Sequence, residues 1–358
     1  MSELRLTNLV KSFDGRRAVD DVSVVVPDSE LLVLLGSSGC GKTTTLRMIC
    51  GLETPDSGSI SLGGRDITAL PPQSRNLGMV FQDYGLYPAM DVRGNIAYGL
   101  QARNLNRAEI DRRVDDAAAQ LGLTDKLQRG IGELSGGEQQ RVALARALAK
   151  DADAFLFDEP LSNLDPKLRY QARRDIQAMH RAKGRPSVYI THDQNEAFAL
   201  ADRVAVMSAG RIHQVGPPSA LLDEPADTFV ARFIGEQPMN LLPVAIEENL
   251  GRPTPVVAGV GVELPGDLAV AASGRMSAIL GVRTDAVRLG RRGDATATVT
   301  DVEPLVGETV VVLRLADGTP LRALVDDDVN PEVGESVSVR LDPAGLRLFD
   351  ADSGLALA

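Results

Sequence analysis

The sequence predicts an α/β domain followed by a small all-β domain, and two observations support this division. Over roughly the first two-thirds of the 358 residues, apolar runs rich in β-branched side chains alternate with stretches of helical periodicity. Such alternation is typical of a mostly parallel sheet that is covered on both faces. From about Met239 the pattern changes to short strands separated by Gly, Pro and Asp. The boundary lies near Ile234 to Pro238, which gives domains of residues 1–235 and 236–358.

The strands of the first domain are expected where its sequence is most apolar. These runs are Val22–Val26, Leu31–Leu35, Phe155–Phe157, Val188–Ile190 and Val204–Met207. Between them, residues 107–121 have the period of an amphipathic helix. Its apolar face comprises Ile110, Val114, Ala117 and Leu121.

In the second domain, the segment Ala316-Asp-Gly-Thr-Pro320 separates the apolar runs Val310–Leu315 and Leu321–Val325. Turn residues between two such runs predict a β-hairpin. The domain is therefore expected to be a small barrel or sandwich.

The charge of the chain is negative and concentrated in its last third. The net charge is −11, and residues 236–358 carry 19 acidic against 10 basic side chains. Because phosphates dominate the affinity of proteins for nucleic acids, such a surface repels them. Phe349 is the one aromatic residue after Pro238, so no base-stacking platform is available either. We therefore expect no nucleic-acid partner.

A glycine-rich segment after Leu31–Leu35 satisfies the pattern G-x-x-x-x-G-K-[ST]. This phosphate loop consists of Gly36, Ser37, Ser38, Gly39, Cys40, Gly41, Lys42, Thr43 and Thr44. Glycines let backbone N–H groups curl round a phosphate, and the following helix adds the positive end of its dipole. Lys42 is expected to reach the β- and γ-phosphates, and the Thr43 hydroxyl to bind Mg²⁺. A dinucleotide-binding G-x-G-x-x-G is excluded, because Thr44 stands where the third glycine would be required.

Two carboxylates, Asp158 and Glu159, end the apolar run that begins at Ala154. Alone, such a pair is more often a turn with solvated charges. Downstream of a phosphate loop, Asp158 is placed to hold Mg²⁺ through water, and Glu159 to activate the attacking water as a general base. The combination predicts a P-loop nucleoside triphosphatase.

A third segment, Leu134-Ser-Gly-Gly-Glu-Gln-Gln-Arg141, lies upstream of these carboxylates. Its small residues and the helix after it suggest a second phosphate site. Together, the three segments resemble the ATP-binding proteins of ABC transporters, and the resemblance covers residues 1–235. Three lesser motifs of that family are present at the expected intervals: Gln82 in Val80–Tyr84, Ser162–Asp165, and His192 in Ile190–Asp193.

The resemblance implies ATP and Mg²⁺ as ligands and gives each motif a role. For ATP binding it implies the phosphate loop, Phe13 stacked on adenine, Ser135, Gly136, Gly137, Glu138 and Asp165. For Mg²⁺ it implies Thr43, Gln82 and Asp158. For catalysis it implies Glu159, His192 and Gln82. The family commonly has Gln-Arg where this chain has Glu138-Gln139, which changes the local charge but should not abolish phosphate contact.

The resemblance also implies partners. In the family, the segment around Ser135 of one copy completes the phosphate site of a second copy, so that ATP is sandwiched in a homodimer. A helical subdomain is expected at about residues 88–155. The segment Gln82–Ala97, with Tyr84 and Tyr87, would form a surface groove for two multi-span membrane permease subunits, unless these tyrosines are ordinary core aromatics.

The resemblance places the protein at the cytoplasmic face of the membrane, as a peripheral subunit. Two cysteines in 358 residues agree with a reducing compartment. An extracytoplasmic solute-binding protein would act with it indirectly.

Four segments of the second domain resemble the OB-like regulatory domains that follow the ATPase in importers of the maltose type. They are Met239–Pro243, Gly281–Arg283, Val302–Thr309 and Leu346–Gly354. The family continues Gly-x-Arg with Pro-Glu, whereas Thr284-Asp285 stands here. Such a domain would stabilise the dimer and bind a regulator, or its acidic surface would serve solubility.

The predicted function is therefore that of the ATP-hydrolysing, energy-coupling subunit of an importer, with a carbohydrate as the expected cargo. Polyamine, iron and sulfate importers carry similar appended domains and remain alternatives. A soluble ABC protein of DNA repair or translation is disfavoured, because the sequence lacks coiled-coil insertions, zinc cysteines and a second ATPase half. Cys40 is either a redox sensor or a small residue that the phosphate loop tolerates.

Overall fold

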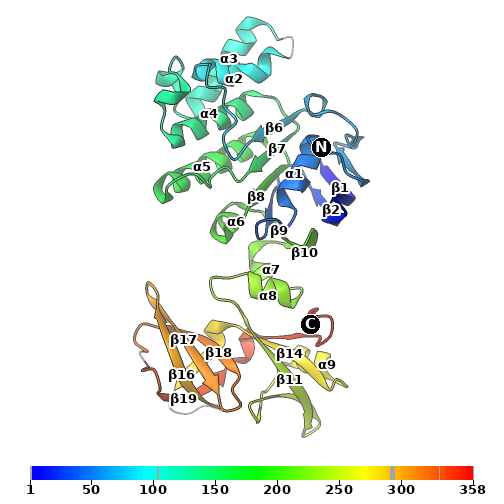
Figure 1. Cartoon of the computed structure of the whole chain (residues 1–358), viewed down its shortest axis with the longest axis vertical. Coiled ribbons are helices and arrows are strands. Elements are labelled where there is room, and N and C mark those ends of the chain that lie inside the picture. The colour runs from blue at the N-terminus through cyan, green and yellow to red at the C-terminus, as the bar shows by residue number, and fades with distance from the viewer. Residues whose placement is uncertain (1, 103–104, 291–294, 330, 358) are drawn as a thin grey trace. The chain divides into compact units, whose positions relative to one another are not determined.

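A computed structural model of the chain describes residues 2–102, 105–290, 295–329 and 331–357 (Figure 1). It divides into two compact units, residues 1–218 and 219–358, which are taken one at a time below. The boundary between the units comes earlier in the sequence than the change of pattern at 235. One reason is that helix α8 (Thr228–Phe233) is hydrogen-bonded to the rest of the second unit. The N–H of Thr228 donates to the carbonyl of Gly354 at 2.9 Å.

A six-stranded sheet is the centre of the first unit, with the strand order β10-β9-β3-β8-β7-β6. All neighbouring strands are parallel except the edge pair β9 and β10. The predicted mostly parallel sheet is thus confirmed. Its strands are β3 (Leu31–Leu35), β6 (Leu77–Val80), β7 (Ala154–Asp158), β8 (Ser187–Thr191), β9 (Arg203–Ser208) and β10 (Arg211–Gly216).

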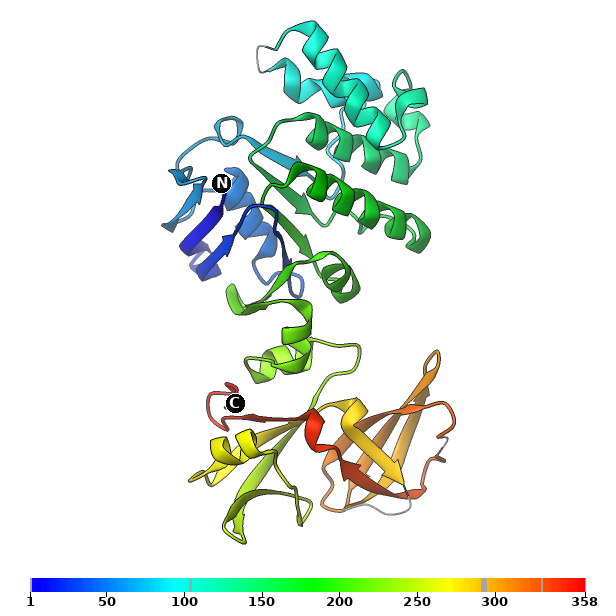
Figure 2. The ribbon, with the colours of Figure 1, turned by 180° about the vertical axis from the view of Figure 1, so that it is seen from behind.

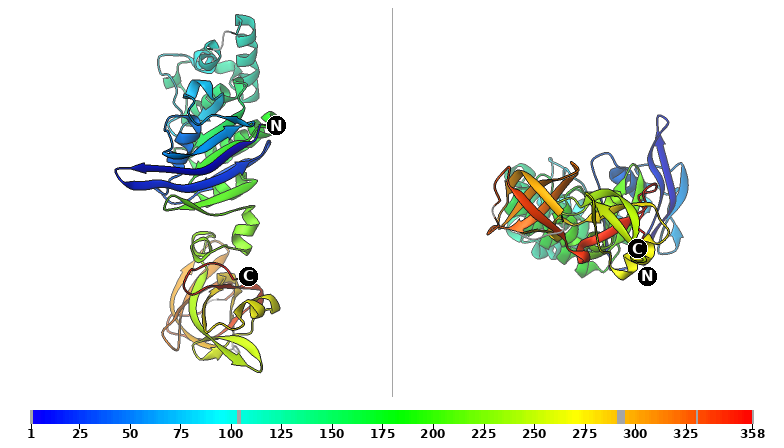
Figure 3. Two further views of the ribbon diagram at one scale, coloured as in Figure 1. Left: turned by 90° about the vertical axis from the view of Figure 1, so that its right-hand side faces the viewer. Right: turned by 90° about the horizontal axis from the view of Figure 1, so that it is seen from below.

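A second, antiparallel sheet of the first unit was not predicted, although the strand expected at Val22–Val26 is confirmed as part of it. Its order is β2-β1-β4-β5, and Figure 3 shows β1 and β2 as a long dark-blue ribbon. Leu4, Leu9 and Val22 from this sheet share one buried core with Leu46 and Met48 of helix α1 (Lys42–Cys50). The strands are β1 (Leu4–Phe13), β2 (Arg16–Val26), β4 (Ser57–Leu62) and β5 (Arg65–Asp66).

The helices of the first unit follow the strands in alternation, and α2, α3 and α4 lie together as a helical group (Figure 1). The predicted helix at 107–121 is confirmed, with Val114 and Ala117 buried. None of the described helices combines the length and the apolar character that a membrane span requires. The helices are α1 (Lys42–Cys50), α2 (Val92–Gln101), α3 (Arg107–Gln120), α4 (Gly136–Ala149), α5 (Pro166–Lys183) and α6 (Gln194–Leu200).

Two five-stranded antiparallel sheets form the second unit, with the orders β13-β12-β11-β14-β20 and β15-β19-β16-β17-β18. Figure 2 shows them as a yellow-green and an orange group of strands. Both sheets contribute to a single core, for example Leu280 and Leu348 from one and Val299 and Leu313 from the other. The predicted small all-β domain is therefore confirmed.

The predicted hairpin is present, with Leu313 of β17 opposite Leu321 of β18. The elements are α7 (Pro218–Asp223), β11 (Asn240–Asn249), β12 (Arg252–Val257), β13 (Val260–Gly261), α9 (Gly266–Ala272), β14 (Ser277–Val282), β15 (Val287–Gly290), β16 (Ala295–Pro304), β17 (Glu308–Leu315), β18 (Pro320–Asp326), β19 (Ser336–Leu341) and β20 (Leu346–Phe349).

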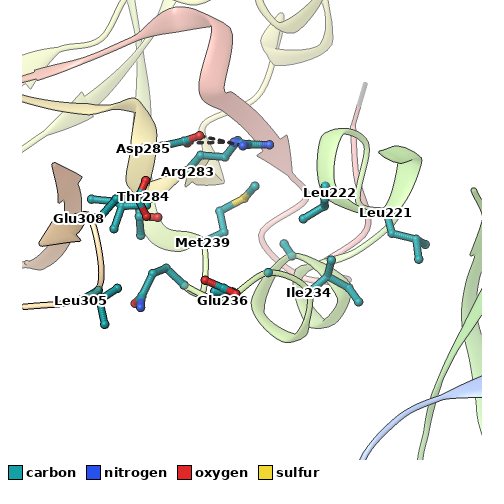
Figure 4. A pocket seen from close by; sticks show the side chains of 14 residues that line it. Leu221, Leu222, Ile234, Glu236, Met239, Arg283, Thr284, Asp285, Leu305 and Glu308 are labelled. Atoms are coloured by element: carbon teal, nitrogen blue, oxygen red, sulfur yellow. Dashed lines mark hydrogen bonds and ion pairs between the residues drawn. The ribbon is translucent and has the colours of Figure 1, made fainter. Parts of the chain in front are cut away.

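Thr284 and Asp285 stand where the resemblance implies Pro-Glu, and both line a cavity of about 170 Å³ (Figure 4). Asp285 forms an ion pair with Arg283 at the wall of this cavity. Nη2 of Arg283 lies 2.8 Å from Oδ2 of Asp285. Hydrogen bonding to Asp285 raises the pKa of Arg283, and the same contact lowers the pKa of Asp285. An acid two residues after the arginine thus stands where the resemblance implies Glu.

Arg75 fixes the C-terminal end of α1, the helix that begins at the phosphate loop. Arg75 is 3% exposed, and its guanidinium donates to the carbonyls of Met48 (2.6 Å), Ile49 (2.8 Å), Thr68 (2.7 Å) and Leu70 (2.7 Å). The last carbonyls of a helix have no partner within the helix, so Arg75 satisfies groups that would otherwise be buried without hydrogen bonds.

We expect Arg75→Met to lower the free energy of unfolding by about 3 kcal/mol, because several buried carbonyls lose their donor at once. Urea denaturation of the full chain measures the change. The exposed Arg65→Met is the matched control and should stay within about 0.5 kcal/mol of the wild type. A loss below about 1 kcal/mol for Arg75→Met would show that water replaces the guanidinium at these carbonyls.

Candidate functional site

The phosphate loop connects β3, which is buried along its whole length, to α1. Gly41 precedes the helix with φ of 111°, a conformation that residues with a side chain rarely adopt. A Cβ at Gly36 would collide with the carbonyl oxygen of Met207, and one at Gly41 with that of Ala18. The glycines are therefore required by close backbone contacts, and the loop keeps the cradle shape that a phosphate needs.

Lys42 lies inside this cradle and is 4% exposed. Its Nζ donates to the carbonyls of Gly36 at 2.7 Å and Ser37 at 3.0 Å. The Sγ of Cys40 is 3.8 Å from the same nitrogen, and Cys40 is buried. The ammonium group is thus held at the loop by acceptors of the loop itself.

Glu159 follows β7 in a strained backbone conformation. Its φ is 42°, in the left-handed region that is unfavourable for a residue with a side chain, and such conformations concentrate at functional sites. Two hydrogen bonds hold it there: the N–H of Glu159 donates to Ile190 at 3.1 Å, and the Ser162 hydroxyl donates to the carbonyl of Glu159 at 2.9 Å. The backbone therefore turns the carboxylate away from the direction that a continued strand would give it.

His192 directly follows β8, the strand beside β7. Its Nδ1 lies 3.0 Å from Oε2 of Glu159, and its side chain is 56% exposed. Because an ionised carboxylate only accepts hydrogen bonds, Nδ1 carries the proton in this contact. Two of the three predicted catalytic residues thus touch each other.

Asp158 is half-buried at the end of β7. Burial, and then the charge of Glu159, raise the pKa of Asp158. A divalent cation beside this carboxylate would relieve that cost. Among the described residues, no group of three or more His, Cys, Asp or Glu could hold a metal ion by itself. This donor set fits Mg²⁺, which takes few protein ligands and completes its shell with phosphate oxygens and water.

Gln82 lies in an exposed loop after β6, and its carbonyl accepts a hydrogen bond of 3.1 Å from the side chain of Asn163. Of the aromatic residues that follow, Tyr84 is buried, so its predicted surface position is wrong. Arg146 of α4 binds its carbonyl at 2.7 Å and draws it inward. Tyr87 is exposed, and its ring is 4.3 Å from that of Tyr98.

Ser135 is the N-cap of α4 and forms a capping box with Glu138. The N–H of Ser135 donates to Glu138 Oε2 at 2.8 Å, and its hydroxyl donates to the same oxygen at 3.0 Å. Lys126 lies 2.7 Å from the other carboxylate oxygen. The hydrogen bond from Lys126, and then those from Ser135, lower the pKa of Glu138 to about 2. A fixed negative charge therefore stands at the predicted second phosphate site.

The structure brings some predicted residues together and leaves others apart. The phosphate loop, His192 and the pair Asp158 and Glu159 follow β3, β8 and β7, which are neighbours in one parallel sheet. Asp165 caps α5, and Phe13 is exposed at the end of β1. In the described part of the chain, Ser135 makes no hydrogen bond to the phosphate loop.

Sequence reasoning missed a polar cluster beside this site. Arg169 of α5 lies 3.7 Å from the buried Glu196 of α6, which also accepts hydrogen bonds from Tyr189 and Thr191 of β8. The sequence feature that could have indicated this cluster is Glu196, four residues after His192. It lies on a helix whose other buried residues are apolar.

Comparisons with known proteins agree with this geometry. Residues 19–162 match the ABC transporter family, and residues 280–349 match the TOBE domain. The chain is 42% identical over 360 residues to the sn-glycerol-3-phosphate import ATP-binding protein UgpC of Brucella abortus (strain 2308), with 98% of each chain covered. It is 40% identical over 364 residues to the protein of that name from Cupriavidus pinatubonensis (strain JMP 134 / LMG 1197), with 99% of each covered.

These matches extend over both units, and they confirm the predicted fold class and ATP as the nucleotide. The chain belongs to the ABC-transporter family, among the ATP-binding proteins that carry a TOBE domain after the ATPase domain.

Proposed function

We propose that this protein hydrolyses ATP to drive an importer, and that two copies share each nucleotide site. The observation that carries the proposal is the contact of 3.0 Å between His192 and Glu159, at the edge of the sheet where the phosphate loop begins. A general base next to a group that orients it is the arrangement needed to activate water.

Each residue of the site has a defined task under this proposal. Lys42 and the N–H groups of the phosphate loop bind the β- and γ-phosphates, and Thr43, Asp158 and Gln82 offer oxygen ligands to Mg²⁺. The metal, when bound, neutralises charge on the phosphate oxygens. Glu159 accepts a proton from the attacking water.

His192 would contact both Glu159 and the terminal phosphate when ATP is bound. Its Nδ1 lies 3.0 Å from Oε2 of Glu159, which leaves Nε2 for a phosphate oxygen. One ring would therefore connect the general base to the phosphate that the water attacks.

Under this proposal, a second copy supplies the donors that complete the phosphate site of the first copy. Ser135 and Gly136 at the N-terminus of α4 are exposed, and the N–H and hydroxyl of Ser135 donate to Glu138 rather than to the phosphate loop of the same chain. Gly136 is exposed and leaves room for a phosphate close to the helix end, whereas Gly137 is buried against Leu168. In a dimer, Ser135 would bind the γ-phosphate held by its partner, with Asp165 at the same interface and Phe13 stacked on adenine.

The cargo and membrane partners follow from the relatives and from the surface. The names of the UgpC relatives support import of sn-glycerol-3-phosphate, a small phosphorylated polyol close to the predicted carbohydrate class. The exposed Tyr87 and Tyr98 support a contact with two membrane permease subunits. An extracytoplasmic solute-binding protein would deliver the cargo, with this subunit peripheral at the cytoplasmic face.

Glu159→Gln is expected to bind ATP but to lose hydrolysis by at least about 100-fold, because an amide does not take a proton from water. The retained ATP should hold two copies together. Light scattering should find a dimer with MgATP and a monomer without it. The exposed Glu248→Gln is the control and should hydrolyse at the wild-type rate. Rapid hydrolysis by Glu159→Gln would contradict the general-base role.

Lys42→Ala should weaken ATP binding by about 100-fold or more, because the loop loses its charge-assisted contacts with two phosphates. Titration with a fluorescent ATP analogue measures the dissociation constant. Lys167→Ala removes an exposed lysine elsewhere in the same unit and should leave it unchanged. Equal affinity for both variants would rule out the phosphate loop as the binding site.

Glu138→Gln should strengthen the dimer formed with MgATP about fivefold, because it removes a carboxylate from the site of the partner's phosphate while keeping the capping hydrogen bonds. The dissociation constant of the dimer is measured in the Glu159→Gln background. The gain should shrink at high salt, and it should not change between pH 6 and 8, where Glu138 stays ionised. A weaker dimer would mean that the carboxylate itself is needed.

A further inference from the structure

The buried carboxylate of Glu196 lines the same small cavity as His192 and Glu159. The proposed function gives this carboxylate no role. Glu196 is 4% exposed. The Tyr189 hydroxyl donates to its Oε2 at 3.0 Å, and the Thr191 hydroxyl donates to the same oxygen at 2.9 Å. Burial raises the pKa of Glu196, because neutral hydroxyls do not balance a buried negative charge, and a neighbouring cation would favour the ionised carboxylate.

Arg169 of α5 provides that cation. Its Nε lies 3.7 Å from Oε1 of Glu196, and its Nη1 lies 3.6 Å from Oδ2 of Asp193. Both distances exceed that of a hydrogen bond, and the buried Nε has no hydrogen-bond partner among the described residues. Nη2 donates to the carbonyl of Leu164 at 3.2 Å. The guanidinium is therefore held by charge on one side and by the backbone on the other.

These contacts join two loops of the candidate site. Leu164 belongs to the loop 159–165, which starts at Glu159 and ends at Asp165, the N-cap of α5. On the other side, Asp193 follows His192, and its N–H donates to the Thr191 hydroxyl at 3.0 Å. A cavity of about 60 Å³ lies between the loops, lined by Glu159, Ser162, Arg169, Thr191, His192, Asp193 and Glu196.

We propose that Arg169 and Glu196 are positioning residues, whose ion pair fixes the loop that carries His192 to the loop that ends at Asp165. The inference rests on the proposed function, since it takes His192 and Glu159 as the reacting pair and Asp165 as facing the second copy. Movement of the loop 159–165 on dimer formation is passed through the Leu164 carbonyl and Arg169 to His192. Binding of ATP to the phosphate loop does not require this connection.

Two variants of the full chain test the proposal. Arg169→Met keeps an unbranched apolar stem and removes the guanidinium and its charge. Glu196→Gln keeps an acceptor for the two hydroxyls and removes the charge that faces Arg169. Each is expected to lower kcat about 10–100-fold, because a small misplacement of His192 suffices for such a loss, while the KM for ATP stays within about threefold. Arg174→Met, on the exposed face of α5, is the control and should leave kcat unchanged.

A double-mutant cycle separates positioning from support of the fold. In a His192→Ala background, measured under single-turnover conditions, neither Arg169→Met nor Glu196→Gln should lower the rate further. The dimer that Glu159→Gln forms with MgATP should persist when Arg169→Met is added. Arg169→Lys keeps the charge and should recover part of kcat.

The outcomes distinguish this inference from the proposed function. A wild-type kcat for Arg169→Met and Glu196→Gln, together with a slow His192→Ala, would overturn the positioning role and leave the proposed function standing. Losses that multiply with that of His192→Ala would also overturn it. Rapid hydrolysis by both His192→Ala and Glu159→Gln would instead overturn the proposed function. Should Arg169→Met fail to fold, Glu196→Gln carries the same cycle.

Discussion

The direction of three neighbouring strands determines where the groups of the site lie. β3, β8 and β7 are parallel and adjacent, so their carboxyl ends meet at one edge of the sheet. At this edge the phosphate loop follows β3, His192 follows β8, and Asp158 and Glu159 lie at the end of β7. Because β3 is wholly buried and Arg75 holds the far end of α1, the loop cannot shift without disturbing the core. The phosphate loop is rigid because its supports lie in the interior of the first unit.

Several groups assigned to ATP already form hydrogen bonds within the chain. Lys42 binds two carbonyls of its own loop, and the Ser135 hydroxyl binds Glu138. A bound phosphate would replace these partners. The side chains would not have to be ordered on binding, because hydrogen bonds within the chain already hold them. This lowers the entropic cost of binding, since the donors already lie in position. It also makes Glu138 a competitor of the phosphate at the N-terminus of α4.

The sequence predicted the parts of the fold that local pattern determines. The apolar runs 31–35, 155–157 and 188–190 and the helix at 107 followed from periodicity, and the phosphate loop from the spacing of its glycines. The sheet β2-β1-β4-β5 escaped prediction because its strands alternate irregularly and contain register shifts, so pairing across the chain decides it. The pair of Arg169 and Glu196 escaped for a similar reason, since only the packing of α5 against α6 brings the two charges together. Tyr84 was misplaced because a hydrogen bond from Arg146 draws its loop inward.

The central claim is that one copy completes the nucleotide site of another. The most direct measurement is the position of Ser135 in a structure of the Glu159→Gln protein with MgATP. The account predicts that Oγ of Ser135 in one copy lies within about 3 Å of a γ-phosphate oxygen bound by its partner, in place of its present contact with Glu138. A nucleotide enclosed by one chain alone, with Ser135 still bound to Glu138 and facing solvent, would contradict it.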